Sequence, residues 1–293
     1  ARSTACWVTE ETAMTKVLAC IDASTYGASI CDHAAWAALQ LGADVELLHV
    51  LDRAPDAVPT DLSGSIGLGA SESLLENLVK LDEDRGRLRM ERGRVILAEA
   101  EKRVRAAGVK TVGTRLRHGG LVDNVHELEA EARVVVLGKR GEHADFAKLH
   151  LGGSVEQVIR ATTLPVLVAS RAFKPIQKIL IAFDGGSSSR KAVDFLVSDP
   201  AFKSYECHLV HAGKPRDADL AWARARLADW GGLHQVAERP GEPEAVIEAY
   251  ARENGIDLLV MGAYGHSPIR RFIVGSTTTA MIRIANLPVL LFR

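Results

Sequence analysis

The sequence is poor in several features that mark particular classes of protein. Of its 293 residues only 5% are aromatic, and only four are cysteines. Cys6, Cys20, Cys31 and Cys207 lie far apart, with no C-x-x-C pair and no histidine cluster at zinc spacing. Isolated thiols without a disulfide pattern are typical of a reducing compartment. We therefore predict no metal centre and a cytoplasmic location.

Charge and hydropathy argue against two further classes. The formal net charge is -1, whereas nucleic-acid-binding domains usually carry a strong basic excess. No apolar run approaches the roughly 20 residues that a membrane-spanning helix needs. The opening residues lack the basic start and apolar segment of a signal peptide, and we expect the first domain to begin at Met14. The 47% of hydrophobic residues are ample for packed cores.

What the sequence does contain is an internal duplication, which indicates two similar domains. The repeated segments are KVLACIDAS (16–24) with KILIAFDGG (178–186), VVVLGKRGE (134–142) with LLVMGAYGH (258–266), and IRATTLPVLVASR (159–171) with IRIANLPVLLFR (282–293). Asp22 lies 27 residues before His49, and Asp184 lies 27 residues before His211. Such equal spacing is hard to reach by chance.

The repeats divide the chain into domains at residues 14–172 and 173–293. In each domain short apolar runs alternate with helical patterns, which predicts a parallel sheet with helices on both faces. The fold class is therefore α/β, with two tandem five-stranded parallel-sheet sandwiches. The first domain has an insertion at about residues 51–100, a loop followed by a long helical pattern. We expect that helix to cover core or to pack against the other domain; a hydrophobic ligand between the halves is an alternative.

Each domain ends in an apolar strand-like run, PVLVAS after Leu164 and PVLLF after Leu287. A final strand lies at the edge of its sheet, and an apolar edge favours pairing with another strand. We expect the two domains to pair within the chain through these last strands, with a pseudo-two-fold axis. A homodimer is also compatible with such edges.

Glycines and hydroxyls follow the fourth strand of the second domain at a defined spacing. Gly262 ends the strand, Gly265 and Gly275 follow, and Ser276 and Thr277 open a helix. Glycine lets a ligand approach the main chain, and a helix N-terminus offers unpaired N–H groups and partial positive charge to a phosphate. The stretch therefore predicts a phosphate site. The simpler alternative is that these glycines only allow strand-to-helix turns.

An aspartate and a strand end complete the predicted site. Asp184 ends the first strand of the second domain, close to the point where the strand order should reverse. A carboxylate repels phosphate, so we expect it to meet ribose hydroxyls or a base edge. The second strand ends at Val210-His211-Ala212, whose backbone could bond an adenine edge. The alternative is that Asp22 and Asp184 merely cap the helices that follow them.

The spacing G-x2-G-x9-G-S, together with the aspartate after the first strand, resembles the universal stress protein family, and the resemblance covers the chain twice. It implies a Rossmann-like fold of the adenine nucleotide alpha hydrolase type and, in many members, an ATP or AMP site, with or without Mg²⁺. The resemblance implies nucleotide contacts in the second domain from Asp184, Val210, Gly262, Gly265, Gly275, Ser276 and Thr277.

The first domain departs from this pattern. Its candidate residues are Asp22, Gly138, Gly141, Gly152 and Ser154. Gly153 stands where the second domain has Ser276, and the interval between the second and third glycines is ten residues instead of nine. A lost hydrogen bond to a charged group costs about 1.5–3 kcal/mol, or roughly ten- to a hundred-fold in affinity. We expect a degraded or altered site, partly compensated by Lys139 and its basic neighbours.

The sequence shows no complete catalytic machinery. There is no Walker lysine after the glycines, no paired carboxylates for magnesium and no nucleophile–base pair. We therefore predict a nucleotide-dependent regulator in the stress response, without efficient catalysis. Two alternatives stay open: a slow ATPase or nucleotidyl-transfer enzyme, and a nucleotide-free scaffold or carrier of a hydrophobic ligand.

Overall fold

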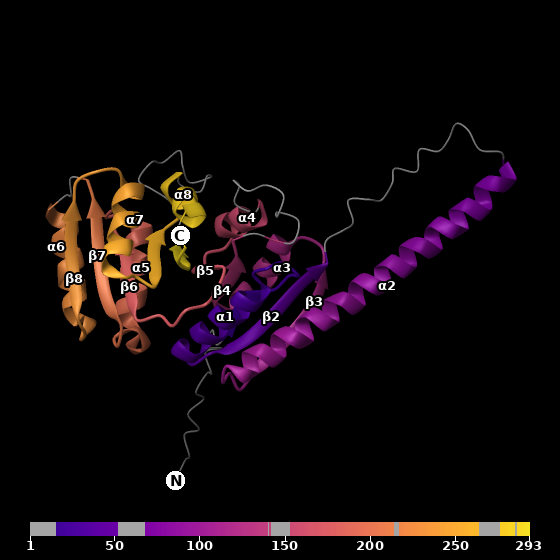
Figure 1. The fold of residues 1–293 in the computed structure, drawn as a ribbon, viewed down its shortest axis with the longest axis horizontal. Helices are drawn as coiled ribbons and strands as arrows, with labels where there is room; N and C mark the ends of the chain where they lie inside the picture. The colour runs from indigo at the N-terminus through magenta and orange to yellow at the C-terminus, as the bar shows by residue number, and fades with distance from the viewer. Residues whose placement is uncertain are drawn as a thin grey trace, which may run out of the picture.

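The computed structural model describes residues 16–51, 68–139, 141, 153–213, 217–263, 276–284 and 286–293. Within these residues ten strands form one continuous sheet with helices on both faces (Figure 1). Most of the strands are short apolar runs rich in Val, Leu and Ile that are buried on both sides, as a parallel sheet between two helical layers requires. The two strands at the ends of the sheet, Val112–His118 and His234–Arg239, are more polar and partly exposed.

The two halves repeat the same order of elements. The first half comprises β1 (Lys16–Cys20), α1 (Gly27–Leu41), β2 (Asp44–Leu51), α2 (Leu68–Ala106), β3 (Val112–His118), α3 (Leu121–Leu128), η1 (Glu129–Glu131), β4 (Ala132–Gly138), α4 (Gly153–Ala161) and β5 (Val166–Ala169). The second half comprises β6 (Lys178–Ala182), α5 (Ser187–Ser198), η3 (Pro200–Phe202), β7 (Glu206–Ala212), α6 (Asp217–Leu227), η4 (Ala228–Trp230), β8 (His234–Arg239), α7 (Pro243–Asn254), β9 (Leu258–Gly262), α8 (Ser276–Ile284) and β10 (Val289–Phe292). This alternation confirms the predicted α/β class.

The strand order is β3-β2-β1-β4-β5-β10-β9-β6-β7-β8. Strands within each half run parallel, and β5 and β10 pair antiparallel with Val168 opposite Val289. The two apolar last strands thus cover each other's edges, in the arrangement that their composition led us to expect. The chain crosses from one half to the other between β5 and β6; the exact domain boundaries at residues 172 and 173 stay a prediction.

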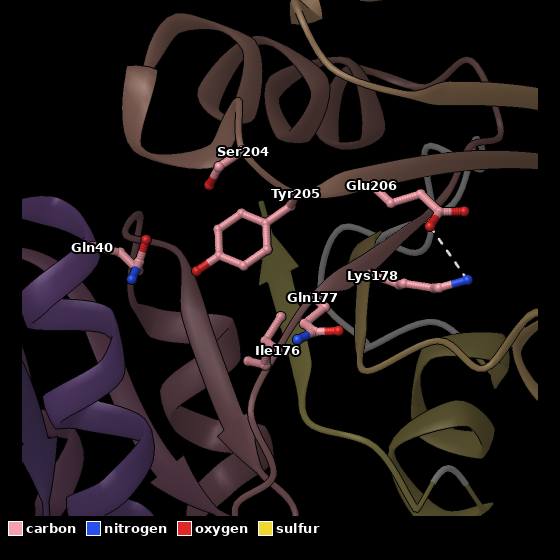
Figure 2. A pocket seen from close by; sticks show the side chains of 7 residues that line it. All are labelled: Gln40, Ile176, Gln177, Lys178, Ser204, Tyr205 and Glu206. Atoms are coloured by element: carbon pink, nitrogen blue, oxygen red, sulfur yellow. Dashed lines mark ion pairs between the residues drawn. The ribbon is translucent and has the colours of Figure 1, made fainter.

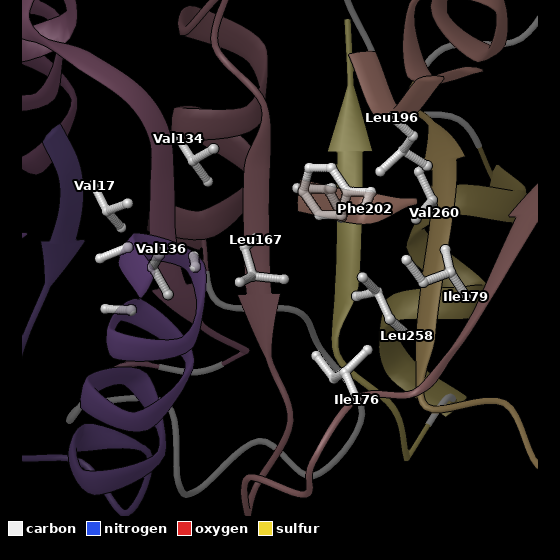
Figure 3. Close-up of a cluster of buried hydrophobic side chains, with 14 of the residues drawn as sticks. Val17, Val134, Val136, Leu167, Ile176, Ile179, Leu196, Phe202, Leu258 and Val260 are labelled. Atoms are coloured by element: carbon white, nitrogen blue, oxygen red, sulfur yellow. The ribbon is translucent and has the colours of Figure 1, made fainter. Parts of the chain in front are cut away.

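Two hydrophobic layers cover the sheet. Helices α1, α2, α5 and α6 bury side chains against one face, and α3, α4, α7 and α8 against the other. The first layer continues across the junction of the halves, where Leu167 of β5 belongs to the same buried cluster as Leu196 and Phe202 of the second half (Figure 3). The junction also carries a hydrogen bond of 3.1 Å from the Trp36 indole to the Tyr205 hydroxyl.

The cysteines behave as small apolar residues, as expected. Cys20, Cys31 and Cys207 are all buried free thiols. Burial raises the pKa of Cys20 and of Cys207 to about 12, so neither ionises near neutral pH. Cys6 lies outside the described residues.

The inserted helix α2 covers core with only part of its length. Near its C-terminus Leu97, Ala100 and Val104 are buried against the sheet. At Gly93 the helix approaches so closely that a Cβ would lie 2.7 Å from Cδ1 of Leu116. The N-terminal part instead projects away from both halves (Figure 1). The prediction that the insertion covers core is thus correct for its C-terminal part, and the described helix does not pack against the second half.

Candidate nucleotide-binding site

The strand order reverses once in each half, between β1 and β4 and between β6 and β9. Such a switch point opens a crevice outside the carboxyl ends of the strands, where ligands of open α/β sheets bind. Asp22 follows β1 and Gly138 ends β4; Asp184 follows β6 and Gly262 ends β9. The topology therefore brings together residues that lie far apart in the sequence.

Gly262 has a packing role that is visible in the structure. A Cβ built there would lie 3.0 Å from Cβ of Ser188 and 3.2 Å from the backbone nitrogen of Ser189. Both neighbours belong to the first turn of α5. The same contact occurs in the first half, where a Cβ on Gly138 would lie 2.9 Å from Cβ of Tyr26. Each glycine lets the start of a helix pack directly on the end of a strand.

Asp184 organises the turn into α5. Its Oδ1 accepts hydrogen bonds from the amide of Gly186 at 2.9 Å and from the hydroxyl of Ser189 at 2.6 Å. The carboxylate is nevertheless exposed. In the first half Oδ1 of Asp22 accepts a bond from the amide of Ser24 at 3.0 Å. These bonds hold the turns that precede the helices. The N-cap residues are Tyr26 for α1 and Gly186 for α5, and neither helix end has a side-chain cap hydrogen bond, so the capping alternative is wrong for both aspartates.

The two histidines at matching distances from these aspartates explain the repeated spacing. Nδ1 of His49 donates to the carbonyl of Ile21 at 2.7 Å, and Nδ1 of His211 donates to the carbonyl of Phe183 at 2.9 Å. Each carbonyl belongs to the residue just before the aspartate. The histidines are buried, and they hold the strand end that presents the carboxylate. The equal spacing is visible in the sequence, but its physical meaning appears only in the fold.

The start of α8 lies against the end of β9. The hydroxyl of Thr278 is buried, 3.2 Å from the carbonyl oxygen of Gly262 and 3.4 Å from that of Ala263. Thr277, one of the predicted residues, is half-buried. The first turn of α8 holds no acidic residue, so its partial positive charge is not offset locally. Thr278 was missed as a positioning residue; its signal was the run of hydroxyls after Ser276.

Five of the predicted residues lie partly or wholly outside the described part of the chain. Gly152, Gly265 and Gly275 lie outside the described residues, and the side chains of Ser154 and Ser276 are likewise not described. Their proposed roles rest on the sequence alone.

The end of β7 presents its backbone in two directions. The carbonyl of Val210 accepts a bond of 2.9 Å from the amide of Phe183, so it faces β6 within the sheet. The amide of Gly213 donates to the carbonyl of Arg239 in β8 at 2.9 Å. Backbone groups of successive residues alternate sides along a strand. The backbone N–H and C=O of Ala212, two residues after Val210, therefore point to the β6 side.

A polar and aromatic cluster fixes the loop beside Asp184. Arg190 donates to the carbonyl of Gly185 at 3.1 Å and pairs with Oδ1 of Asp219 at 2.5 Å. Its guanidinium lies 4.4 Å from the centre of the Trp222 ring, which stacks on Phe183. Gly185 takes a φ of +76° there, a conformation that suits glycine. The cluster anchors α6 to the end of β6.

The first half differs in charge at the equivalent place. Gly141 lies close to the aspartate, since a Cβ on it would lie 3.2 Å from Oδ2 of Asp22. Lys139 follows β4 directly and is buried, and burial lowers its pKa to about 8. The first turn of α4 contains Glu156, which opposes anion binding at that helix end.

A separate pocket lies at the opposite, amino end of the strands. It has a volume of about 490 Å³ and is lined by Gln40, Ile176, Gln177, Lys178, Ser204, Tyr205 and Glu206 (Figure 2). An ion pair of 3.3 Å joins Lys178 to Glu206 at its wall. The lining is mostly polar, and none of the predicted site residues contributes to it.

Two other kinds of feature are absent from the described residues. Among them, no group of three or more His, Cys, Asp or Glu side chains could hold a metal ion. None of the helices in the described part of the chain is long and apolar enough to cross a membrane.

Comparison with known proteins places the chain in a family. The model of the universal stress protein family matches residues 14–170 and 214–293. The chain belongs to the universal stress protein family. Universal stress protein Slr1230 of Synechocystis sp. is 39% identical over 287 residues, covering 96% of this chain and 100% of that protein. The family predicted from the glycine spacing is thus confirmed.

Solved structures of universal stress proteins share the fold over both halves. A universal stress protein from Archaeoglobus fulgidus matches with a TM-score of 0.71 at 20% identity, covering 96% of this chain and 97% of that one. A putative universal stress protein from Pseudomonas aeruginosa matches with a TM-score of 0.60 at 16% identity, covering 96% and 94%. Asp184 and Val210 lie between the two regions of the family match.

Proposed function

We propose that this universal stress protein binds an adenine nucleotide, ATP or AMP, at the switch point of its second half. The observation that carries the proposal is the junction of α8 with β9. The buried hydroxyl of Thr278 reaches the carbonyl of Gly262, which brings the N-terminus of α8 to the crevice beside Asp184. A helix N-terminus with no acidic residue in its own first turn is a suitable anchor for phosphate.

The proposed contacts divide between the two ends of the nucleotide. Asp184, held by the turn into α5, would accept bonds from ribose hydroxyls. The backbone at the end of β7 would meet the adenine edge; we retain Val210 as predicted and add Ala212, whose backbone faces the switch point. The phosphates would lie against the residues of the glycine motif, namely Gly262, Gly265, Gly275, Ser276 and Thr277. Mg²⁺ would enter with the phosphates of ATP.

The first half is proposed as a weaker or altered site built from Asp22, Gly138, Gly141, Gly152 and Ser154. Glu156 in the first turn of α4 repels an anion at that helix end, whereas Lys139 supplies a positive charge next to β4. The difference between the halves therefore predicts one tighter and one weaker nucleotide per chain.

We further propose a regulatory action in the cytoplasm without efficient turnover. A slow ATPase or nucleotidyl-transfer activity is the competing function. Incubation with ATP and Mg²⁺ under steady-state conditions discriminates between them, because several turnovers per second would contradict a binding protein. The hydrophobic-carrier alternative gains no support from the pocket between the halves, whose lining is mostly polar.

The test uses matched aspartate variants in a calorimetric titration with ATP and with AMP. Asp184→Asn keeps an oxygen that can accept the bonds from Gly186 and Ser189 but removes the charge. We expect it to weaken the tighter site by about ten- to a hundred-fold, the cost of a hydrogen bond to a charged group. Asp22→Asn should leave that site unchanged.

A folding control accompanies the titration. Ser189→Ala removes the bond to Asp184 within the turn but keeps the carboxylate, so it should lower stability more than affinity. If neither nucleotide binds to the wild type at millimolar concentration, or if Asp184→Asn binds as the wild type does, the proposed site is wrong.

A further inference from the structure

The N-terminal part of α2 presents an apolar surface that no nucleotide site uses. The helix has 39 residues, a length of about 58 Å at 1.5 Å per residue. Its buried contacts with the sheet come from the region between Gly93 and Val104. Before that region, Leu81 is 45% and Leu88 is 71% exposed, and Val95 is 55% exposed where the helix lies on the sheet.

These three residues form a ridge with a heptad period. Leu81, Leu88 and Val95 follow one another at intervals of seven residues, and Leu74 continues the interval in the sequence. Residues seven apart on a helix share one face, with a drift of about 20° per heptad. Val95 lies two residues from Gly93, an angular separation of about 160° around the helix at 3.6 residues per turn. The ridge therefore points away from the sheet.

The charges along the same segment are sharply divided. Residues 72–84 contain five acidic residues and one lysine, whereas residues 85–94 contain five arginines and one glutamate. The acidic residues are Glu72, Glu76, Asp82, Glu83 and Asp84, and the arginines are Arg85, Arg87, Arg89, Arg92 and Arg94. Arg85 and Arg94 are 52% and 62% exposed at their side chains, in long contacts of 3.9 and 3.5 Å with Asp82 and Glu91.

This division of charge along the helix favours a second copy of α2 as the partner, in an antiparallel orientation. A second copy of α2 laid parallel would bring acidic residues against acidic residues and arginines against arginines. Laid antiparallel, the acidic half of each helix meets the arginine half of the other. A coiled-coil seam has two apolar positions in each heptad, of which Leu81, Leu88 and Val95 supply one, and flanking charges set the orientation of the helices.

We propose that Leu81, Leu88 and Val95 form a self-association ridge that binds the same ridge of a second copy of this chain in an antiparallel coiled coil. A pairing centred on the boundary between Asp84 and Arg85 places Leu88 of one copy near Leu81 of the other. The globular halves then lie at opposite ends of the paired helices. The proposal is independent of nucleotide binding.

Sedimentation equilibrium of the full chain tests the ridge. We expect a dimer for the wild type and a rise of at least about tenfold in the dissociation constant for Leu88→Glu, since burying an unpaired charge in a seam is strongly unfavourable. Val79→Glu is the matched control. Val79 is 58% exposed on the same segment but lies about 160° from Leu81 around the helix, so this variant should still dimerise.

The salt dependence of the wild-type dimer tests the orientation. Opposite charges are screened by salt, so the antiparallel dimer should weaken as NaCl increases. A dimer that strengthens with salt, or a wild type that stays monomeric at all concentrations tested, would overturn the proposal.

A charge-swap pair tests complementarity directly. One variant changes the five arginines to glutamate, and the other changes the five acidic residues to lysine. Each alone should stay monomeric, because its helix carries one sign of charge, and an equimolar mixture should form one-to-one dimers in native mass spectrometry. Circular dichroism checks that each variant is folded. Failure of the folded variants to combine, or dimerisation of each alone as strong as that of the wild type, would contradict the inference.

Discussion

Replacement of Gly262 by alanine tests whether this glycine serves helix packing. The added Cβ would lie 3.0 Å from Cβ of Ser188, 3.2 Å from the nitrogen of Ser189 and 3.5 Å from the carbonyl carbon of Ser188. Two of these atoms belong to the backbone of α5, so no rotation of a side chain relieves the contact. The first turn of α5 must therefore move away from β9 by a few tenths of an ångström.

The cost follows from how tightly that turn is held. Ser188 and Ser189 are buried, and Ser189 also donates to Asp184 at 2.6 Å. Overpacking of a well-packed site costs about 1–3 kcal/mol. For a unit of 150–250 residues each kcal/mol corresponds to about 2–4 °C in the melting temperature. We expect Gly262→Ala to melt several degrees below the wild type in differential scanning calorimetry.

The control is the equivalent substitution where space is open. A Cβ on Gly153 would meet nothing within 4 Å, and Gly153 is the first residue of α4. Alanine is favoured over glycine in helices by up to about 1 kcal/mol, so Gly153→Ala should melt at or above the wild-type temperature. A Gly262→Ala protein that melts with the wild type would refute the packing argument.

Three further predictions concern protonation and the junction of the halves. Burial raises the pKa of Glu129, but hydrogen bonds led by the amide and hydroxyl of Thr163 outweigh it and lower the pKa to about 2. Because this carboxyl has a lower pKa in the folded than in the unfolded protein, it stabilises the fold above pH 4.5, and this stabilisation is lost as the pH falls toward 2. Glu129→Gln should therefore reduce the loss of stability at acid pH when the urea midpoint is measured against pH. An acid dependence equal to that of the wild type would contradict this. Burial lowers the pKa of Lys139 to about 8, so wild-type stability should rise between about pH 8 and 10.5 as the unfolded chain keeps the proton longer. Lys139→Met should remove that rise and increase the free energy of unfolding by up to about 3 kcal/mol at pH 7. A variant less stable than the wild type at pH 7 would contradict this prediction. Tyr205→Phe removes the acceptor of the Trp36 indole; it should cost about 0.5–1.5 kcal/mol and shift the tryptophan emission, whereas unaltered emission would deny the contact in solution.

Much of the fold was readable in the sequence because it depends on local pattern. Apolar runs flanked by helical patterns predicted the alternation of strand and helix, and the duplicated segments predicted two similar five-stranded units, which the structure joins into one sheet. The equal spacing of Asp22 and Asp184 from their histidines marked the ends of two neighbouring strands. These features can be recognised without knowing which residues are in contact, because they reflect which face of each element must be buried.

The candidate site could be predicted only in part. The sequence identified Asp184 and Gly262 and implied that both lie at the switch point, which the strand order bears out. It could not show that Gly262 accommodates a helix that begins 75 residues earlier at Ser187, or that Thr278 fastens α8 to β9. It also could not decide between Val210 and Ala212, because the direction of a backbone group depends on which neighbouring strand its hydrogen bonds reach.

The duplicated α/β architecture, the combination of an aspartate with a glycine motif, and the charge division within the inserted helix all follow from the order of residues along the chain. Which of these features meet in space depends on the fold. The contacts of α2 with the sheet begin near Gly93, so the part of the helix before that residue extends away from the sheet and exposes its ridge. The physical reason is that periodicity states which residues prefer burial, whereas only the folded chain shows whether another surface is there to bury them.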